Sequence, residues 1–269
     1  MLVYIKCKFR YWQILGCVLF LFLTEGKGCL HSQTINLEGD VWEPYVMNSG
    51  TGKNGFMVDI AYTVFKRAGY KINFKVVPWQ RALEDVRNGT TDGAVGIYFT
   101  QARSLQLVIP SEELGLSVNK FYVRKESVWK YIGSKSLETQ IIGVIAGYDY
   151  GSLNTYIEQL QQKNSPKLEV VSGNQASEKN IKKLISGRIT VTVEDDLVMK
   201  RYVAKLQIGD KIKEAGMVSP SNRVGIAFSS HNPKSVLYAR VLSEGIQKLR
   251  KSGELKKILD KYSVKDWKK

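Results

Sequence analysis

The hydrophobic positions of this chain follow two different spacings after residue 33. Residues 56–68 place Phe56, Ile60 and Val64 three or four positions apart with further apolar residues, which predicts an amphipathic helix. Residues 72–76 alternate apolar and polar side chains, the pattern of a strand. The two spacings predict a helix followed directly by a strand.

The same alternation of strand and helix continues to the end of the chain. Short apolar or extended runs predict strands at 34–37, 94–97, 117–123, 141–145, 168–171, 189–193 and 224–228. Helical spacing predicts helices at 177–186, 197–206, 232–251 and 254–261, and one ending near 162, with Asn232 as a cap before Pro233. Strands that alternate with helices predict parallel sheets covered by helices, an α/β fold.

Residues 78–103 contain the clearest candidate site. A short helix carries Trp79 on its apolar face and ends at Gly89, and the strand at 94–97 follows. Thr100 and Arg103 then lie in a predicted polar turn just past the carboxyl end of that strand, where open α/β sheets bind ligands. Arginine grips a carboxylate with two parallel hydrogen bonds, although Arg103 is equally compatible with an exposed loop position.

Composition and charge exclude several function classes. The 269 residues include 43% apolar and 24% charged residues, enough to bury one large or two modest domains. The net charge is +15, but the basic residues are scattered, and no basic run alternates with aromatic residues. Without a zinc-finger or helix-turn-helix pattern, nucleic-acid binding is not predicted.

The first 28 residues differ from the rest. Lys6, Lys8 and Arg10 precede an apolar run at 12–23 and a small polar segment, the order of a secretory signal peptide. A retained anchor helix is the alternative, although the run is short for a membrane span. The mature protein is therefore expected to be soluble and exported.

Cysteine and histidine are too scarce for most catalytic or metal sites. Cys29 is the last cysteine, and lipid attachment there is disfavoured by Gly26, where such sites carry a large aliphatic residue. The only histidines are His31 and His231, which are 200 positions apart. The sequence therefore has too few histidines to favour a histidine-based zinc site or a serine–histidine triad. No cofactor and no metal is predicted.

A series of motifs resembles the extracellular solute-binding proteins of family 3, which serve amino-acid ABC transporters. The resemblance runs from about residue 33 to the end of the chain, and it is specific in the order of its motifs rather than in any single one. The motifs are Gly39-x-x-Trp42-x-Pro44-Tyr45, Gly55-x-x-x-Asp59, Trp79-x-x-Ala82-Leu83, Gly89-x-x-Asp92-Gly93, Thr100-x-x-Arg103, Gly187-Arg188-Ile189 before Asp195, Val224-Gly225-Ile226, and Gly253-x-Leu255-x-x-Ile258-x-x-Lys261-Tyr262.

This resemblance implies two α/β lobes, joined by two hinge strands, that close on a ligand. The first lobe would comprise 33–116 and 226–269, and the second 120–221. The implied function is periplasmic capture of a small polar ligand, an amino acid above all, and delivery to an ABC transporter permease in the inner membrane. The protein is expected to act as a monomer and not as an enzyme.

The resemblance also assigns roles to single residues. Arg103 would bind the α-carboxylate of the ligand and Asp195 its α-ammonium, a pairing that suits a zwitterion. The side-chain pocket would be walled by Trp42, Tyr45 and Trp79, with backbone or hydroxyl groups from Ile97, Tyr98 and Thr100. The alternatives are a helix cap for Asp195 and simple core or rim positions for Trp42, Tyr45 and Trp79.

One loop departs from the family pattern. Tyr148 stands where many members have a small hydroxyl residue, and the loop would touch the ligand from the second lobe. If Glu43, Asp149 and Glu194 line the cleft, their charge favours a cationic ligand. The ligand class is therefore less well defined than the fold.

Two other functions remain compatible with this scaffold. Some cyclohexadienyl or arogenate dehydratases share it, and such an enzyme would need an acid, a role open to Glu194, Asp195 or Asp149. A ligand-sensing module that signals through another protein is the second.

Overall fold

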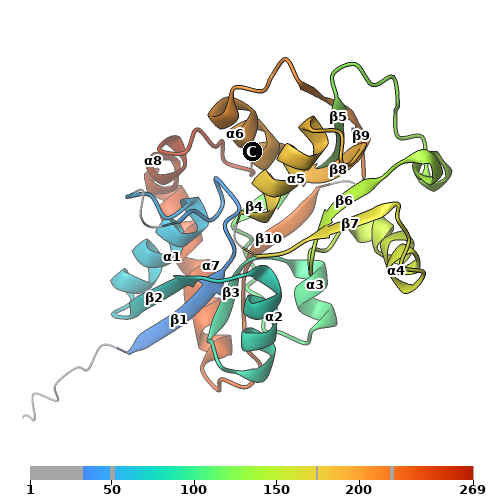
Figure 1. Cartoon of the computed structure of the whole chain (residues 1–269). Helices are drawn as coiled ribbons and strands as arrows, with labels where there is room; N and C mark the ends of the chain where they lie inside the picture. Colours follow the sequence, from blue (N-terminus) through green and yellow to red (C-terminus); the bar gives the residue numbers. More distant parts are fainter. Residues whose placement is uncertain (1–32, 49–51, 174, 219–220, 269) are drawn as a thin grey trace, which may run out of the picture. The chain divides into compact units, whose positions relative to one another are not determined.

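A computed structural model of the chain describes residues 33–48, 52–173, 175–218 and 221–268 (Figure 1). The predicted signal peptide at 1–28 and Cys29 lie outside the described residues. Within those ranges no helix has both the length and the apolar character needed to cross a membrane.

The first lobe is built on a five-stranded sheet with the order β2-β1-β3-β10-β4. Its strands are β1 (Thr34–Gly39), β2 (Lys71–Val76), β3 (Gly93–Tyr98), β4 (Gly115–Ser117) and β10 (Asn222–Phe228). Its helices are α1 (Phe56–Arg67), α2 (Trp79–Asn88), α3 (Phe99–Ser104), α7 (Ser235–Lys251) and α8 (Glu254–Asp260). Strand β1 runs parallel to β2 and β3, whereas β10 runs antiparallel to β3 and β4.

The second lobe repeats this plan in the order β7-β6-β8-β5-β9. Its strands are β5 (Asn119–Arg124), β6 (Ile142–Ile145), β7 (Leu168–Val171), β8 (Val191–Asp195) and β9 (Ile212–Met217). The helices α4 (Asn154–Gln162), α5 (Ala176–Ile185) and α6 (Asp196–Leu206) belong to it, with short 3-10 turns η2 (Ser134–Thr139) and η3 (Gly151–Leu153). Strand β6 is parallel to β7 and β8, and β5 is antiparallel to β8 and β9.

The chain passes between the two sheets twice. Strand β4 ends at Ser117 and β5 begins at Asn119, so Val118 alone separates a strand of one sheet from a strand of the other. The return lies between Met217, the end of β9, and Asn222, the start of β10. The lobe boundaries at 116, 120, 221 and 226 stay predictions.

Several local expectations from the sequence are wrong. The sheets are mixed rather than parallel, because β10 runs antiparallel to β3 in the first sheet and β5 runs antiparallel to β8 in the second. The polar turn expected around Thr100 is the short helix α3, and β9 was not anticipated. Asn232 does not cap α7; its Oδ1 accepts a hydrogen bond from the Lys234 N–H in the turn before the helix.

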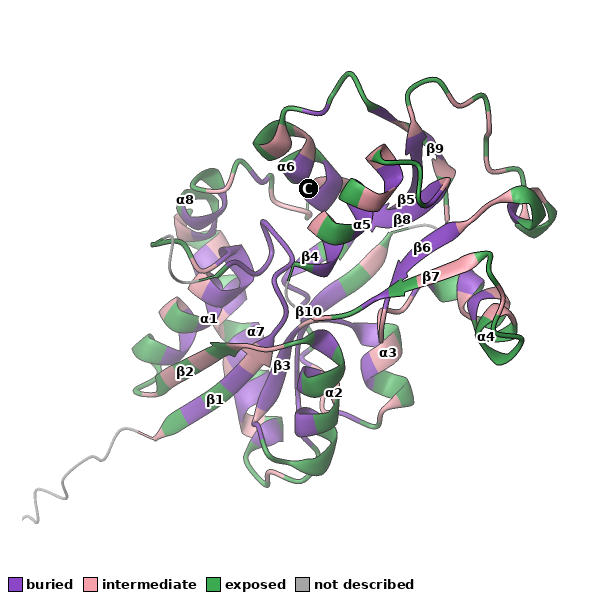
Figure 2. Cartoon of the chain, viewed as in Figure 1, coloured by how far each residue is buried: buried purple, intermediate pink, exposed green. Residues whose placement is uncertain are grey.

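Burial explains why most strands were predictable. The central strands β3, β6, β8 and β10 are buried along most of their length, so each reads as an apolar run (Figure 2). Strand β1 is buried at every second residue in its first half and reads as an alternation.

Helices α1 and α7 approach closely where Gly245 of α7 faces Val64 of α1. A Cβ placed on Gly245 would lie 2.3 Å from Val64 Cγ1, so the two helices can pack this closely only around a glycine. This contact joins the N-terminal and C-terminal parts of the first lobe.

Gly245→Ala is expected to destabilise the protein by about 1–2 kcal/mol. Alanine gains about 1 kcal/mol of helix propensity over glycine, but overpacking costs about 1–3 kcal/mol and dominates at this distance. Denaturant unfolding measures the difference, and Glu244→Ala, at the exposed neighbouring position, should change stability by less than about 0.5 kcal/mol. A more stable Gly245→Ala protein would contradict the close approach.

Candidate functional site

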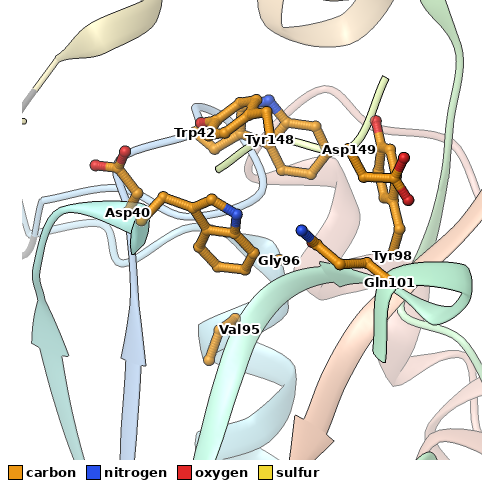
Figure 3. Close-up of a pocket in the computed structure, with 9 residues that line it drawn as sticks. Asp40, Trp42, Val95, Gly96, Tyr98, Gln101, Tyr148 and Asp149 are labelled. Carbon is orange, nitrogen blue, oxygen red and sulfur yellow. The ribbon is translucent and has the colours of Figure 1, made fainter. Parts of the chain in front are cut away.

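A small cavity lies where the two lobes meet (Figure 3). Its volume is about 30 Å³, room for one or two water molecules. The described residues that line it are Asp40, Trp42, Trp79, Val95, Gly96, Tyr98, Gln101, Tyr148 and Asp149. The view in Figure 3 shows Asp40 and Asp149 on opposite sides of the cavity, with Val95 below.

Strand ends bring these side chains together. Asp40 and Trp42 follow β1 directly, Tyr98 is the last residue of β3, and Tyr148 and Asp149 follow β6 of the second lobe. The carboxyl ends of parallel strands share one edge of a sheet, which is where open α/β sheets bind ligands. Both lobes thus present their binding edges to the same cavity.

Hydrogen bonds join the two lobes across this cavity. The Gly147 carbonyl accepts from the Trp79 indole Nε1–H and from the Gln101 amide Nε2, each at 3.0 Å. The Thr100 hydroxyl donates to Asp149 Oδ2 at 3.2 Å. These bonds fix the loop after β6 against the first lobe.

Tyr148 occupies the centre of this contact. Its ring meets the Trp79 ring edge-on with centroids 6.3 Å apart, and it packs against each of the four hydrophobic clusters of the described residues. Burial raises the pKa of the Tyr148 phenol well above its ordinary value, so the side chain is neutral. The bulky side chain therefore fills space at this contact that a small hydroxyl side chain would leave open.

Trp42 and Tyr45 form a second contact between the lobes. Their rings stack with centroids 4.0 Å apart. The Trp42 indole Nε1–H donates to Glu194 Oε1 at 3.3 Å, and the Tyr45 hydroxyl donates to Asp195 Oδ2 at 3.2 Å. Both aromatic residues thus hold the carboxyl end of β8.

The Asp195 carboxylate accepts five hydrogen bonds. Oδ1 accepts from the backbone N–H groups at the start of α6, Leu197 at 2.9 Å and Val198 at 3.1 Å. Oδ2 accepts from the Ser117 hydroxyl at 2.7 Å, the Val118 N–H at 3.1 Å and Tyr45. The helix-cap role, one of the two roles open from the sequence, is confirmed.

The predicted site residues fall into three groups. Trp42, Trp79, Tyr98 and Tyr148 line the cavity, and Thr100 contacts it through Asp149. Tyr45 and Asp195 are buried outside the lining, at the crossing between the lobes, and Ile97 is buried in β3. Arg103 is exposed on α3, and its guanidinium makes no hydrogen bond or ion pair with any residue that the structure describes.

Four lining residues were missed from the sequence: Asp40, Val95, Gly96 and Gln101. Asp40 had a usable signal, because it follows a predicted strand just as Thr100 does. Gln101 had none, since its part depends on the carbonyl of Gly147, 46 positions away.

Three carboxylates near the cavity are shielded from water, namely Asp40, Glu194 and Asp195. Burial raises the pKa of Asp40 to about 6 and that of Glu194 to about 7. Burial also raises the pKa of Asp195 to about 6, against its hydrogen bonds, which favour the carboxylate. Glu43 is already paired, with Arg201 and Lys205.

No group of three or more His, Cys, Asp or Glu side chains within the described ranges is placed to hold a metal ion.

Comparisons with known proteins identify the fold and the family. A protein of Neisseria gonorrhoeae named "Probable histidine-binding protein" is 24% identical over 225 residues, covering 82% of this chain and 78% of that protein. The substrate-binding protein of an amino acid ABC transporter has a similar structure, with TM-score 0.67 and 23% identity over 85% of this chain and 98% of that one. A histidine kinase sensor domain similar to periplasmic binding proteins gives TM-score 0.70 and 18% identity, over 86% and 96% of the two chains.

The two-lobed α/β fold predicted from the sequence is confirmed by these structures and has the type II periplasmic binding protein arrangement. The profile of one family matches residues 37–265, nearly the whole described chain. The chain therefore belongs to the bacterial extracellular solute-binding proteins, family 3.

Proposed function

We propose that this protein captures an amino acid or a related small amine in the periplasm and delivers it to an ABC transporter permease of the inner membrane. The observation that carries the proposal is the cavity at the carboxyl ends of β1, β3 and β6, lined from both lobes by aromatic and polar side chains. In this proposal the protein acts as a monomer and binds its ligand without catalysing a reaction.

Ligand entry requires the lobes to separate. A cavity of about 30 Å³ has no room for an amino acid. Separation would break the bonds of Trp79 and Gln101 to Gly147, of Thr100 to Asp149 and of Trp42 to Glu194. The bonds of Asp195 to Ser117 and Val118 lie at the crossing itself and can persist during a rotation about it.

Arg103 and Asp195 take different places in this proposal. Arg103 is exposed and has no partner among the described residues, so its guanidinium can turn toward the carboxylate of a bound amino acid. Asp195 already accepts five hydrogen bonds, so contact with a ligand ammonium would require it to release some of them. Both ligand contacts stay predictions.

A sensory role is the second candidate. It is favoured by the likeness to the histidine kinase sensor domain, which shares the fold over 86% of this chain. The same ligand would then report to a signalling partner instead of a permease.

A thermal-shift screen of residues 33–269 against amino acids and small amines tests the proposal. A ligand at a hundredfold excess over its dissociation constant adds about 2.7 kcal/mol of stability, a clear rise in melting temperature. Prephenate and arogenate are included, because a shift with product formation would identify an enzyme instead. No shift with any amino acid or amine would overturn the proposal.

Arg103→Ala should weaken binding of a carboxylate-bearing ligand by about tenfold or more, because a charge-assisted hydrogen bond contributes about 1.5–3 kcal/mol. Isothermal titration with the ligand found in the screen measures the change. Arg240→Ala, at an exposed position of α7, is the matched control and should leave affinity unchanged. Equal affinity of Arg103→Ala and the unmodified protein would remove Arg103 from the site.

Glu194→Gln should change the pH dependence of stability. The folded-state pKa of Glu194, about 7, lies above the ordinary value of 4.5, so its protonation stabilises the folded state. That stabilisation is complete below pH 4.5 and is lost as the pH rises to 7, a change of about 3 kcal/mol. Glutamine stays neutral and can accept the same bonds from Trp42 and the Asp195 N–H.

The stability of Glu194→Gln relative to the unmodified protein should therefore increase between pH 5 and pH 8. Comparing the two proteins removes the opposite trend of surface acids such as Glu169, whose pKa is lowered by its hydrogen bond to Lys183. Denaturant unfolding at several pH values gives the difference. A difference that is constant with pH would mean that Glu194 ionises normally in the folded protein.

A further inference from the structure

The walls of the cavity are aromatic on several sides. Trp42, Trp79, Tyr98 and Tyr148 all line it. Trp42 and Tyr98 meet edge-on with centroids 6.2 Å apart, as do Trp79 and Tyr148 at 6.3 Å. Aromatic faces attract cations through their quadrupole, most strongly where the cation has lost its water. Four rings around one cavity are therefore suited to an organic cation.

The charged groups of the cavity have one sign. Of the nine described residues that line it, Asp40 and Asp149 are acidic and none is basic. This is unexpected in a chain with 40 Lys and Arg against 25 Asp and Glu. An anionic group placed in this cavity would meet two carboxylates and no cation.

Some of the other buried acids form ion pairs, whereas Glu194 and Asp195 accept hydrogen bonds from neutral groups. Glu43 forms ion pairs with Arg201 and Lys205, and Glu113 with Arg223. By contrast, neither Asp40 nor Asp149 forms an ion pair with any Lys or Arg in the described ranges; their carboxylates accept hydrogen bonds only from neutral groups, such as the Val41 N–H at 2.7 Å and the Thr100 hydroxyl at 3.2 Å.

The Asp40 carboxylate is buried without an ion pair, and the positive charge of Lys179 acts on it only through space. Burying a charge is costly unless a partner of opposite sign is near. The pKa of Asp40, raised by burial to about 6, reflects that cost. A ligand that brings a positive charge would supply the missing partner when the lobes meet around it.

We propose that the cavity recognises an alkylammonium or guanidinium group of the ligand, held between the four aromatic rings and the Asp40 and Asp149 carboxylates. This inference rests on the proposed function and specifies its ligand class. A carboxylate on the ligand is not required, because no basic side chain lines the cavity and Arg103 lies outside the lining. Basic amino acids and the amines without their carboxylate both satisfy the site.

Isothermal titration with matched ligands tests the charge requirement. L-lysine is compared with the neutral L-norleucine, L-arginine with the neutral L-citrulline, and each amino acid with its decarboxylated amine, cadaverine or agmatine. In the series that binds, the charged amino acid should bind at least about tenfold tighter than its neutral match, the effect of one charge-assisted contact. The decarboxylated amine should also bind.

Three results would overturn this inference. Neutral and charged matches could bind equally, the amines could fail where their amino acids bind, or only other amino acids could bind. Each would leave the proposed function standing. Failure of every amino acid and amine to bind would overturn both.

The Asp149→Asn variant tests whether the charge of this one residue is needed for binding of the charged ligand. Asparagine keeps an oxygen able to accept the bonds from the Gly151 N–H and Asn154, both made to Oδ1. It should lower affinity for the charged ligand by about tenfold or more and leave affinity for its neutral match unchanged. Asp40→Asn should act in the same direction.

Asp210→Asn is the matched control, since Asp210 is exposed before β9 and does not line the cavity. It removes the same charge and should change neither affinity. Melting temperatures without ligand establish that each variant is folded. Equal losses for Asp149→Asn and Asp210→Asn would mean that only the overall charge matters and would overturn the site.

Discussion

The Asp195 carboxylate is the interaction on which the arrangement of the two lobes depends. It ends β8, caps α6, and binds Ser117 and Val118 at the crossing between the sheets as well as Tyr45 of the first lobe. A carboxylate has about four lone-pair positions, so five donors leave it fully used. One buried side chain thus fixes a helix start, a crossing and an aromatic residue of the opposite lobe.

Most elements could be predicted from the sequence because their signals are local. Helix α1 and strand β3 are specified by the spacing of their own apolar residues. The cavity residues Trp42 and Tyr98 were predicted from the resemblance to the family, not from any periodicity. The motif order then supplied the lobes, which no single periodicity defines.

The rest depends on contacts that no local pattern records. The Trp79 indole bonds Gly147, 68 positions away, and Tyr148 fills the space beside them. Asp195 caps α6 and also accepts hydrogen bonds from Ser117 and Val118 at the crossing. The motif alone predicted only a ligand contact for it. Arg103 lies in the predicted motif, but its side chain is exposed on α3 and does not line the cavity. A motif gives the position of a residue and does not determine where an exposed side chain points.

The distribution of indole groups makes the contact between the lobes optically visible. Trp42 and Trp79 donate their N–H groups across it, to Glu194 and Gly147. Trp129 and Trp267 donate within their own lobes, to the Ser136 carbonyl at 2.8 Å and to Glu113 at 3.0 Å. Separation of the lobes would expose the first pair to water and shift its emission to the red, while the second pair serves as an internal reference. The intrinsic tryptophan fluorescence of the protein therefore reports the separation of the lobes without an attached label.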